Sequence, residues 1–210
     1  MSTEQDFFRQ VMGRFPTGVT IVTTQSGEGL SGLTVNSFAS VSLDPPLVLI
    51  CIDLKSHTLP FLRASGSFAV NFLTDVQEDL SRCFATASAE RNEYFCHAPY
   101  HVAATGSPIL DGILAFIDAR VIAEYPGGDH VIFLGKVEAL GTDSKVMFLD
   151  SDSKARSTLT EWQDGTSNNA HAPLTNQGEM PLAYYRGQYR HLASDYLTPS
   201  LPAGYEKNYR

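Results

Sequence analysis

Two contrasting hydrophobic patterns lie next to each other between residues 32 and 53. From Leu33 to Leu43, apolar or small residues alternate with polar ones, which is the period-2 pattern of a β-strand. One face is apolar or small, with Leu33, Val35, Ser37, Ala39, Val41 and Leu43. The other face is polar around one aromatic ring, with Thr34, Asn36, Phe38, Ser40 and Ser42. This row of hydroxyls and an amide predicts a site for a ligand with many hydrogen-bonding groups.

A turn and a second strand follow this segment. Asp44-Pro45-Pro46 turns the chain, and Leu47 to Ile52 is a continuous apolar run. Such a run is typical of a strand that is buried on both faces.

The rest of the chain predicts further strands with a few short helices. Helical spacing of apolar residues predicts helices at residues 3–15, 55–64 and 76–87. β-branched or alternating segments predict strands at residues 17–24, 67–72, 113–125, 130–140 and 181–189. Strands dominate and few βαβ spacings occur, so the pattern favours an antiparallel barrel with peripheral helices over a doubly wound sheet.

A long polar segment interrupts this pattern after the strand at 130–140. At 210 residues we expect one domain, 1–210, with a polar insertion at 141–179 and a C-terminal tail at 195–210. The insertion holds the single tryptophan, Trp162, and a short helix is expected near Ala155 to Gln163. It is either a surface insertion or a lid or arm that Trp162 docks onto a partner subunit.

Composition and charge exclude several classes of partner. The net charge of −8 argues against nucleic acid or an anionic membrane as the main partner, although a local phosphate site needs only one or two cations. The longest apolar run is too short to span a bilayer, and the N-terminus lacks the pattern of a signal peptide. Cys51, Cys83 and Cys96 are odd in number and lack a Cys-x-x-Cys motif, which predicts free thiols and a cytoplasmic location.

Two local motifs suggest chemistry that the wider pattern does not support. Gly27, Gly29 and Gly32 match the G-x-G-x-x-G dinucleotide fingerprint, with Asp53 near the expected distance for a ribose-binding acid. That fingerprint requires a helix after the glycines, whereas the sequence there is strand-like. Cys96-His97 and His101 invite a metal site, but Pro99 lies between the histidines and no fourth ligand is near, so we expect no metal.

Three further positions have both a structural and a functional interpretation. His130 follows Gly128-Asp129 at the start of a strand, where it is either exposed or poised at a site. Lys55-Ser56 begins a helix, where Ser56 is an N-cap or part of a phosphate site. Arg91 is either a solvated charge or an anion clamp.

Several segments in a fixed order resemble one protein family. They are FRQVMGRFPTGVTIVTT, GLTVNSFASVSLDPPLVLICID, SHT, GSFAVNFL, QEDLSRCFA, GSPIL, GGDHVIFLGKVEAL and PLAYYRGQY. In order and spacing they resemble the short-chain flavin reductases of the split-barrel FMN-binding superfamily, the reductase components of two-component flavin-dependent monooxygenases. The match covers Phe8 to Leu140 and resumes at Pro181.

The resemblance implies a mainly β, six-stranded Greek-key split barrel with flanking helices. It implies a homodimer with FMN or FAD near the subunit interface and NADH or NADPH as the hydride donor. His130 matches the histidine near the nicotinamide, which makes it the candidate catalytic residue. The cofactor-binding residues implied by the family motifs are Thr34, Val35, Asn36, Ser37, Ser42, Cys51, Ile52, Asp53, Lys55, Ser56, Thr58, Phe84, Ala85, Arg91, His130 and Tyr185. The insertion at 141–179 departs from the family pattern.

These observations favour a flavin reductase that transfers a hydride from NAD(P)H to flavin and supplies a partner monooxygenase through flavin diffusion. One alternative is a non-catalytic flavin- or haem-binding module on the same barrel, acting as an electron carrier or sensor. Another is a Rossmann dehydrogenase, which requires a helix at Thr34 to Val41.

Overall fold

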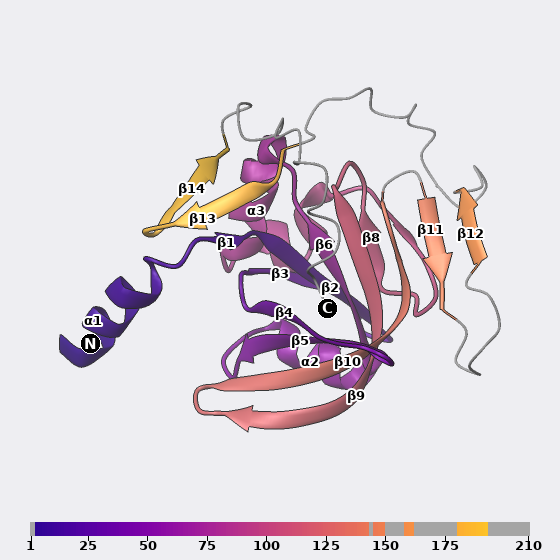
Figure 1. Ribbon diagram of the computed structural model, residues 1–210, viewed down its shortest axis with the longest axis horizontal. Coiled ribbons are helices and arrows are strands. Elements are labelled where there is room, and N and C mark those ends of the chain that lie inside the picture. Colours follow the sequence, from indigo (N-terminus) through magenta and orange to yellow (C-terminus); the bar gives the residue numbers. More distant parts are fainter. Residues whose placement is uncertain (1–2, 143–144, 150–157, 162–179, 193–210) are drawn as a thin grey trace, which may run out of the picture.

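The computed structural model describes residues 3–142, 145–149, 158–161 and 180–192 (Figure 1). Its α-helices are α1 (Thr3–Met12), α2 (Thr58–Ser65), α3 (Glu78–Ala85) and α4 (Ala89–Asn92), with 3₁₀ turns η1 (Asp75–Gln77) and η2 (Phe95–His97). Its first eight strands are β1 (Thr17–Gly18), β2 (Thr20–Ser26), β3 (Gly29–Val35), β4 (Phe38–Leu43), β5 (Pro46–Asp53), β6 (Ser67–Phe72), β7 (Tyr100–Val102) and β8 (Pro108–Leu110). The remaining strands are β9 (Ala115–Gly127), β10 (His130–Gly141), β11 (Lys145–Phe148), β12 (Thr158–Glu161), β13 (Leu182–Tyr185) and β14 (Gln188–His191).

One large antiparallel sheet forms the body of the protein. Its strands follow the order β4-β5-β10-β9-β6-β2-β3, and the β11–β12 hairpin pairs with the end of β10. A smaller sheet, β1-β13-β14, lies beside the start of β2 (Figure 1). Helix α2 packs on β2, β3 and β6, and α3 packs on β3. The predicted mainly β, antiparallel class with peripheral helices is confirmed.

The predicted strand over Leu33 to Leu43 is in fact two strands. The chain leaves β3 at Asn36 and Ser37 and turns into β4, which pairs with β5 rather than with β2. The expected apolar face therefore does not stay in one environment, because Leu43, at the end of β4, is 93% exposed. Local alternation predicted strand correctly but could not show where the chain changes neighbours.

Strand β5 is buried on one face only. Val48, Ile50 and Ile52 lie in the core, whereas the intervening Leu47, Leu49 and Cys51 are half-buried. The prediction that Leu47 to Ile52 is buried on both faces is therefore wrong. An apolar run does not distinguish a strand that is buried on both faces from one that is buried on a single face.

Three further predictions differ from the structure or lie outside it. The predicted strand 181–189 is a hairpin, β13–β14, because Arg186 and Gly187 take left-handed backbone angles at its turn. Residues 158–161 of the expected short helix form β12. Trp162 and the tail at 195–210 lie outside the described residues.

Helix α1 stands apart from the body of the fold. The amphipathic pattern predicted a helix here, and the helix is present, but it buries none of its residues. Phe7 and Phe8 are each 66% exposed, and Phe15, just after the helix, is 67% exposed. Figure 1 shows the helix projecting from the small sheet, away from the large one. No described helix is both long and apolar enough to cross a membrane.

Candidate functional site

A cleft of about 200 Å³ lies where the chain leaves β3. Its walls come from the residue just before β2, the end of β3, the end of α3 and the β13–β14 hairpin. The lining residues are Val19, Thr34, Val35, Asn36, Ala85, Tyr184 and Tyr189. We call this space the β3 cleft.

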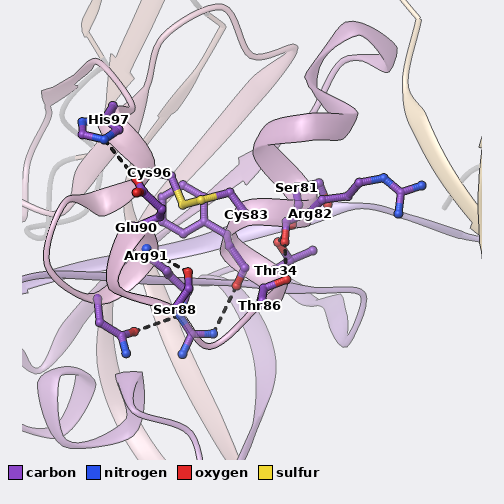
Figure 2. The surroundings of a disulfide bond; sticks show 12 residues. Thr34, Ser81, Arg82, Cys83, Thr86, Ser88, Glu90, Arg91, Cys96 and His97 are labelled. Atoms are coloured by element: carbon purple, nitrogen blue, oxygen red, sulfur yellow. Dashed lines mark hydrogen bonds and ion pairs between the residues drawn. A yellow bond between two sulfur atoms is a disulfide. The ribbon is translucent and has the colours of Figure 1, made fainter.

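Hydrogen bonds and ring contacts fix the walls of the β3 cleft. The Thr34 hydroxyl donates to the Ser81 carbonyl oxygen at 2.7 Å, which holds the end of β3 against α3 (Figure 2). Ser81 Oγ lies 2.9 Å from the Tyr189 hydroxyl, so the same helix also anchors the hairpin. Tyr184 and Tyr189 are cross-strand partners whose rings meet edge to face, with centroids 5.5 Å apart.

An apolar groove of about 510 Å³ adjoins the β3 cleft and shares Val19 and Asn36 with it. Phe15, Phe38, Phe72, Leu114 and Leu182 are among the side chains that line it. Phe38, the aromatic residue of the predicted polar face, packs against Phe72 with ring centroids 5.2 Å apart.

The two cavities together suit a flat ring system with one polar edge. The Asn36 side chain is exposed and forms no hydrogen bond with any described residue, so its amide can serve a ligand. The Thr34 oxygen, which donates its proton to Ser81, can still accept a hydrogen bond. The apolar wall of the groove covers the rest of such a ring.

A second group of predicted site residues surrounds the end of β5. Ser37 Oγ donates to the Cys51 carbonyl oxygen at 2.8 Å, which connects the segment after β3 to β5. Beyond it, Asp53 is the cross-strand partner of His130. His130 is 41% exposed, and its Nδ1 lies 2.7 Å from Asp129 Oδ1. That hydrogen bond is the main reason why the pKa of Asp129 lies below its usual value.

The predicted phosphate-binding residues differ in how available they are. Lys55 is exposed, and its backbone N–H donates to Asp53 Oδ1 at 2.7 Å. Thr58 is fully buried, and its hydroxyl is occupied between Ser31 and the Gly32 carbonyl oxygen. Ser56 Oγ accepts the Thr58 N–H at 3.2 Å, so it supports the start of α2, where the N-cap residue is His57.

The residues predicted from the α3 region divide between core and cleft. Phe84 is buried, and its ring packs edge to face on Phe95 at 5.1 Å, whereas Ala85 faces the β3 cleft. Arg91 Nη1 donates to the Phe84 carbonyl oxygen at 3.3 Å, and burial lowers the pKa of this guanidinium (Figure 2). Arg91 therefore supports the end of α3 directly.

Of the predicted site residues, Thr34, Val35, Asn36 and Ala85 line the β3 cleft, and Ser42, Ile52 and Tyr185 are among those that do not. Ser42 Oγ accepts the Asp44 N–H in the β4–β5 turn, and Ile52 lies in the core. Tyr185 lies under the Arg186 guanidinium, at 5.3 Å from the ring centroid. The tyrosines on the cleft are Tyr184 and Tyr189, which sequence reasoning missed. The available signal was the period of 2, which places Tyr184 on the same face as the buried Leu182.

A disulfide bond joins Cys83 to Cys96, with an S–S distance of 2.02 Å (Figure 2). The prediction of three free thiols is therefore wrong, and Cys51 is the one free cysteine. Burial raises the pKa of the Cys51 thiol. The sequence shows only the spacing of the cysteines, whereas the packing of α3 against η2 brings this pair together.

The dinucleotide fingerprint of Gly27, Gly29 and Gly32 is not used as such. The segment after it forms β3 and β4, so no helix N-terminus meets a pyrophosphate there. Gly32 has a different role, since a Cβ at this position would lie 2.8 Å from the Phe84 ring. The Rossmann dehydrogenase hypothesis is therefore wrong.

Comparison with known proteins agrees with this fold. The family model described as "Flavin reductase like domain" matches residues 12–193. A reductase subunit of a flavin-dependent monooxygenase, HsaB from Rhodococcus jostii, is 33% identical over 193 residues, covering 92% of this chain and 80% of the relative. The NADH-dependent FMN reductase AsuE2 from Streptomyces nodosus subsp. asukaensis is 43% identical over 136 residues, which cover 64% of this chain and 74% of the relative.

A solved structure of a monooxygenase component has a similar fold. Nitrilotriacetate monooxygenase component B from Mycobacterium thermoresistibile superposes with a TM-score of 0.73 at 32% identity, covering 96% of this chain and 93% of that chain. The fold and site define a mainly β protein with a cleft suited to a planar cofactor. The chain belongs to the flavin reductase family.

The β3 cleft generates a direct test with a matched control. Replacing Ala85 with leucine extends a side chain into the cleft, whereas Ala87→Leu changes an exposed residue that does not line it. We expect Ala85→Leu to raise the apparent Kd for FMN by about tenfold or more, because the ring loses its place, and Ala87→Leu to leave it unchanged. Flavin fluorescence titration measures both. Equal affinities in the two variants would place the flavin elsewhere.

Proposed function

We propose that this protein is a flavin reductase that transfers a hydride from NADH or NADPH to FMN or FAD. Its reduced flavin then supplies a separate flavin-dependent monooxygenase. The observation that carries this proposal is the position of Thr34, Val35 and Asn36, the segment that the family resemblance assigns to flavin, on the lining of the β3 cleft.

In this proposal the chain contributes binding and orientation. When bound, the flavin supplies the ring that accepts the hydride. Asn36 offers an amide to the polar edge of that ring, and the apolar groove excludes water from its other end. Lys55 and Arg91 supply positive charge for the ribityl phosphate. Neither an amide nor a guanidinium has to change protonation state for this role.

His130 is the proposed orienting residue for the nicotinamide. Its Nδ1 is held by Asp129, which leaves Nε2 directed to a ligand carboxamide. Lys55 lies near the same carboxylate, because it contributes to lowering the pKa of Asp129. The end of β5 and the β9–β10 turn thus gather one imidazole and one ammonium group beside Asp53.

The relatives support the choice of reaction and partner. Two of them are named for NADH-dependent reduction of FMN or of flavin. Others are named as the reductase subunit of a monooxygenase or the reductase component of a halogenase. A non-catalytic electron carrier or sensor on this fold would share the cleft but would not consume NADH.

An assay of the purified protein tests this function. NADH and NADPH oxidation at 340 nm is followed with FMN, with FAD and without added flavin. We expect flavin-dependent oxidation of at least one nicotinamide. A protein that binds flavin but oxidises neither nicotinamide would instead be the non-catalytic module.

The role of His130 makes a separate prediction. We expect His130→Ala to lower kcat/KM for NADH by about 10- to 100-fold, because the nicotinamide loses its orientation, with little change in flavin affinity. His97→Ala is the control, since His97 is an exposed histidine paired with Glu90 on another part of the fold. If His130→Ala abolished flavin binding yet left turnover at saturating flavin normal, the assignment would be wrong.

We also propose that the protein forms a homodimer through the outer face of β4, β5, β10 and β9. Cross-strand pairing aligns Leu49 with Leu134 and Ala123, and Cys51 with Ile132 and Tyr125, in two adjacent rows. Of these side chains, Tyr125 is 52% exposed and the others on β5 and β10 are half-buried. An extended apolar sheet face of this kind is typical of a protein–protein interface.

A charge in this face should separate the subunits. We expect Leu134→Lys, and independently Tyr125→Lys, to convert a dimer to a monomer, because each buries an ammonium group without a partner. Val76→Lys, on the exposed η1 turn, is the control. Light scattering after size exclusion measures the mass. A monomeric wild-type protein, or dimers in both face variants, would contradict this interface.

We further propose that residues 1–210 form one domain with a polar insertion at 141–179. The cytoplasmic location stays a prediction. The Cys83–Cys96 disulfide means that three free thiols no longer support it.

A further inference from the structure

The Cys83–Cys96 disulfide closes a loop that carries residues of the proposed flavin site (Figure 2). The two cysteines are 13 positions apart in the sequence. Between them lie Ala85, which lines the β3 cleft, and Arg91, to which the proposed function gives the flavin phosphate. A cross-link restricts the conformations of the loop that it closes, so this one acts on two flavin-binding residues at once.

The η2 end of the disulfide has a backbone conformation that its residues do not favour. Phe95, Cys96 and His97 have φ angles of 51°, 53° and 51°. Residues with a side chain rarely adopt this left-handed conformation, and then as single residues rather than three in succession. Such a conformation persists only where the surrounding structure holds it.

Packing, hydrogen bonding and the disulfide together hold this left-handed turn. Phe95 is buried, and its ring packs edge to face on Phe84 with centroids 5.1 Å apart. The His97 backbone N–H donates to the Tyr94 carbonyl oxygen at 2.9 Å. The disulfide adds a cross-link from Cys96 to α3. Reduction removes that cross-link and allows the turn to relax toward ordinary backbone angles.

The disulfide lies within reach of small reagents. Cys83 and Cys96 are both half-buried, so neither is enclosed in the core. Beside Cys96, the His97 side chain is 71% exposed and Tyr94 is 53% exposed. The sheet face proposed for the dimer, on β4, β5, β10 and β9, includes neither cysteine. A peroxide or a small dithiol can therefore approach from the η2 side.

We propose that Cys83 and Cys96 form a reversible redox site that controls the affinity for flavin. In the disulfide state, α3 and η2 are joined, and Ala85 and Arg91 are held in place for the ligand. In the dithiol state, η2 relaxes and flavin binds more weakly. This inference rests on the proposed function, because it describes the regulation of the same flavin site.

Both directions of this switch transfer two electrons. In the oxidation, one cysteine thiolate attacks hydrogen peroxide, the O–O bond breaks, and a sulfenic acid and hydroxide form. The second thiolate then displaces hydroxide from that sulfur, so the S–O bond breaks and the S–S bond forms. The two sulfurs are oxidised, and peroxide and the two thiol protons become two molecules of water. In the reduction, a dithiol forms a mixed disulfide with one cysteine and then closes into its own disulfide, which leaves both cysteines protonated.

Flavin affinity in the two redox states tests this site without any need for turnover. The wild-type protein is reduced with dithiothreitol or oxidised with hydrogen peroxide, freed of the reagent and titrated with FMN by flavin fluorescence. Alkylation after unfolding counts the thiols, which are one in the disulfide state and three in the dithiol state. We expect reduction to raise the apparent Kd for FMN by about tenfold. Three thiols after oxidation, or the same Kd in both states, would overturn the proposal.

Serine variants separate a redox site from a structural cross-link. Cys83→Ser and Cys96→Ser each remove the disulfide and keep Cys51. We expect both to show the weaker FMN binding of the reduced wild-type protein, with no further response to dithiothreitol. Thermal unfolding is measured beside each titration. A lower Tm with an unchanged Kd for FMN would show a structural cross-link only and would contradict the proposal.

Two substitutions of His97 test the coupling through the left-handed turn. Both remove the imidazole that pairs with Glu90, but glycine adopts a positive φ readily and alanine does not. The turn in His97→Gly is less strained, so it relaxes less when the disulfide is reduced. We therefore expect reduction to raise the Kd for FMN less in His97→Gly than in His97→Ala. Equal increases would rule out control of the flavin site through η2.

The same measurements separate this inference from the function on which it rests. A protein whose FMN affinity follows the redox state of the cysteine pair, but which oxidises neither nicotinamide, would retain the redox site and lose the reductase function. A protein that oxidises NADH with FMN, but has the same Kd in both redox states, would retain the function and lose the redox site.

Discussion

The close packing of α3 against β3 is the contact on which the site depends. The Phe84 ring occupies the space that a side chain at position 32 would need, so only glycine allows this approach. The Thr34–Ser81 hydrogen bond then fixes the end of β3, and the Cys83–Cys96 disulfide holds the other side of α3 to η2 (Figure 2). Because α3 carries Ala85, which lines the β3 cleft, this helix positions one wall of that cleft.

The β13–β14 hairpin supplies further walls of the β3 cleft, in addition to the wall from α3. Tyr184 and Tyr189 both line the β3 cleft, and the Tyr189 hydroxyl meets Ser81 on α3. The hairpin follows the segment 141–179 in sequence but returns to the start of β2 in space, where β13 pairs with β1.

Two surfaces of the described chain expose hydrophobic side chains to solvent. The outer face of the large sheet and the apolar side of α1 both present hydrophobic side chains to solvent. The amphipathic sequence predicted α1 correctly, but amphipathicity implies a partner surface without saying whether it lies in the same chain. For β5, likewise, the uninterrupted apolar run predicted a buried strand, whereas Leu47, Leu49 and Cys51 on one of its faces are only half-buried.

The sequence by itself determined the class of fold, the approximate positions of the main helices and strands, and the family. The limits of β6 match the predicted 67–72, and alternation after the three glycines already excluded a Rossmann helix. Periodicity carries this information because it is local, set by how successive side chains alternate along one strand. Only the tertiary structure decided which distant residues meet: Tyr184 and Tyr189 lie with Thr34 and Ala85 on one cleft, and Cys83 is bonded to Cys96. Those contacts depend on strand pairing and helix packing between segments that are far apart in the chain, so no local pattern specifies them.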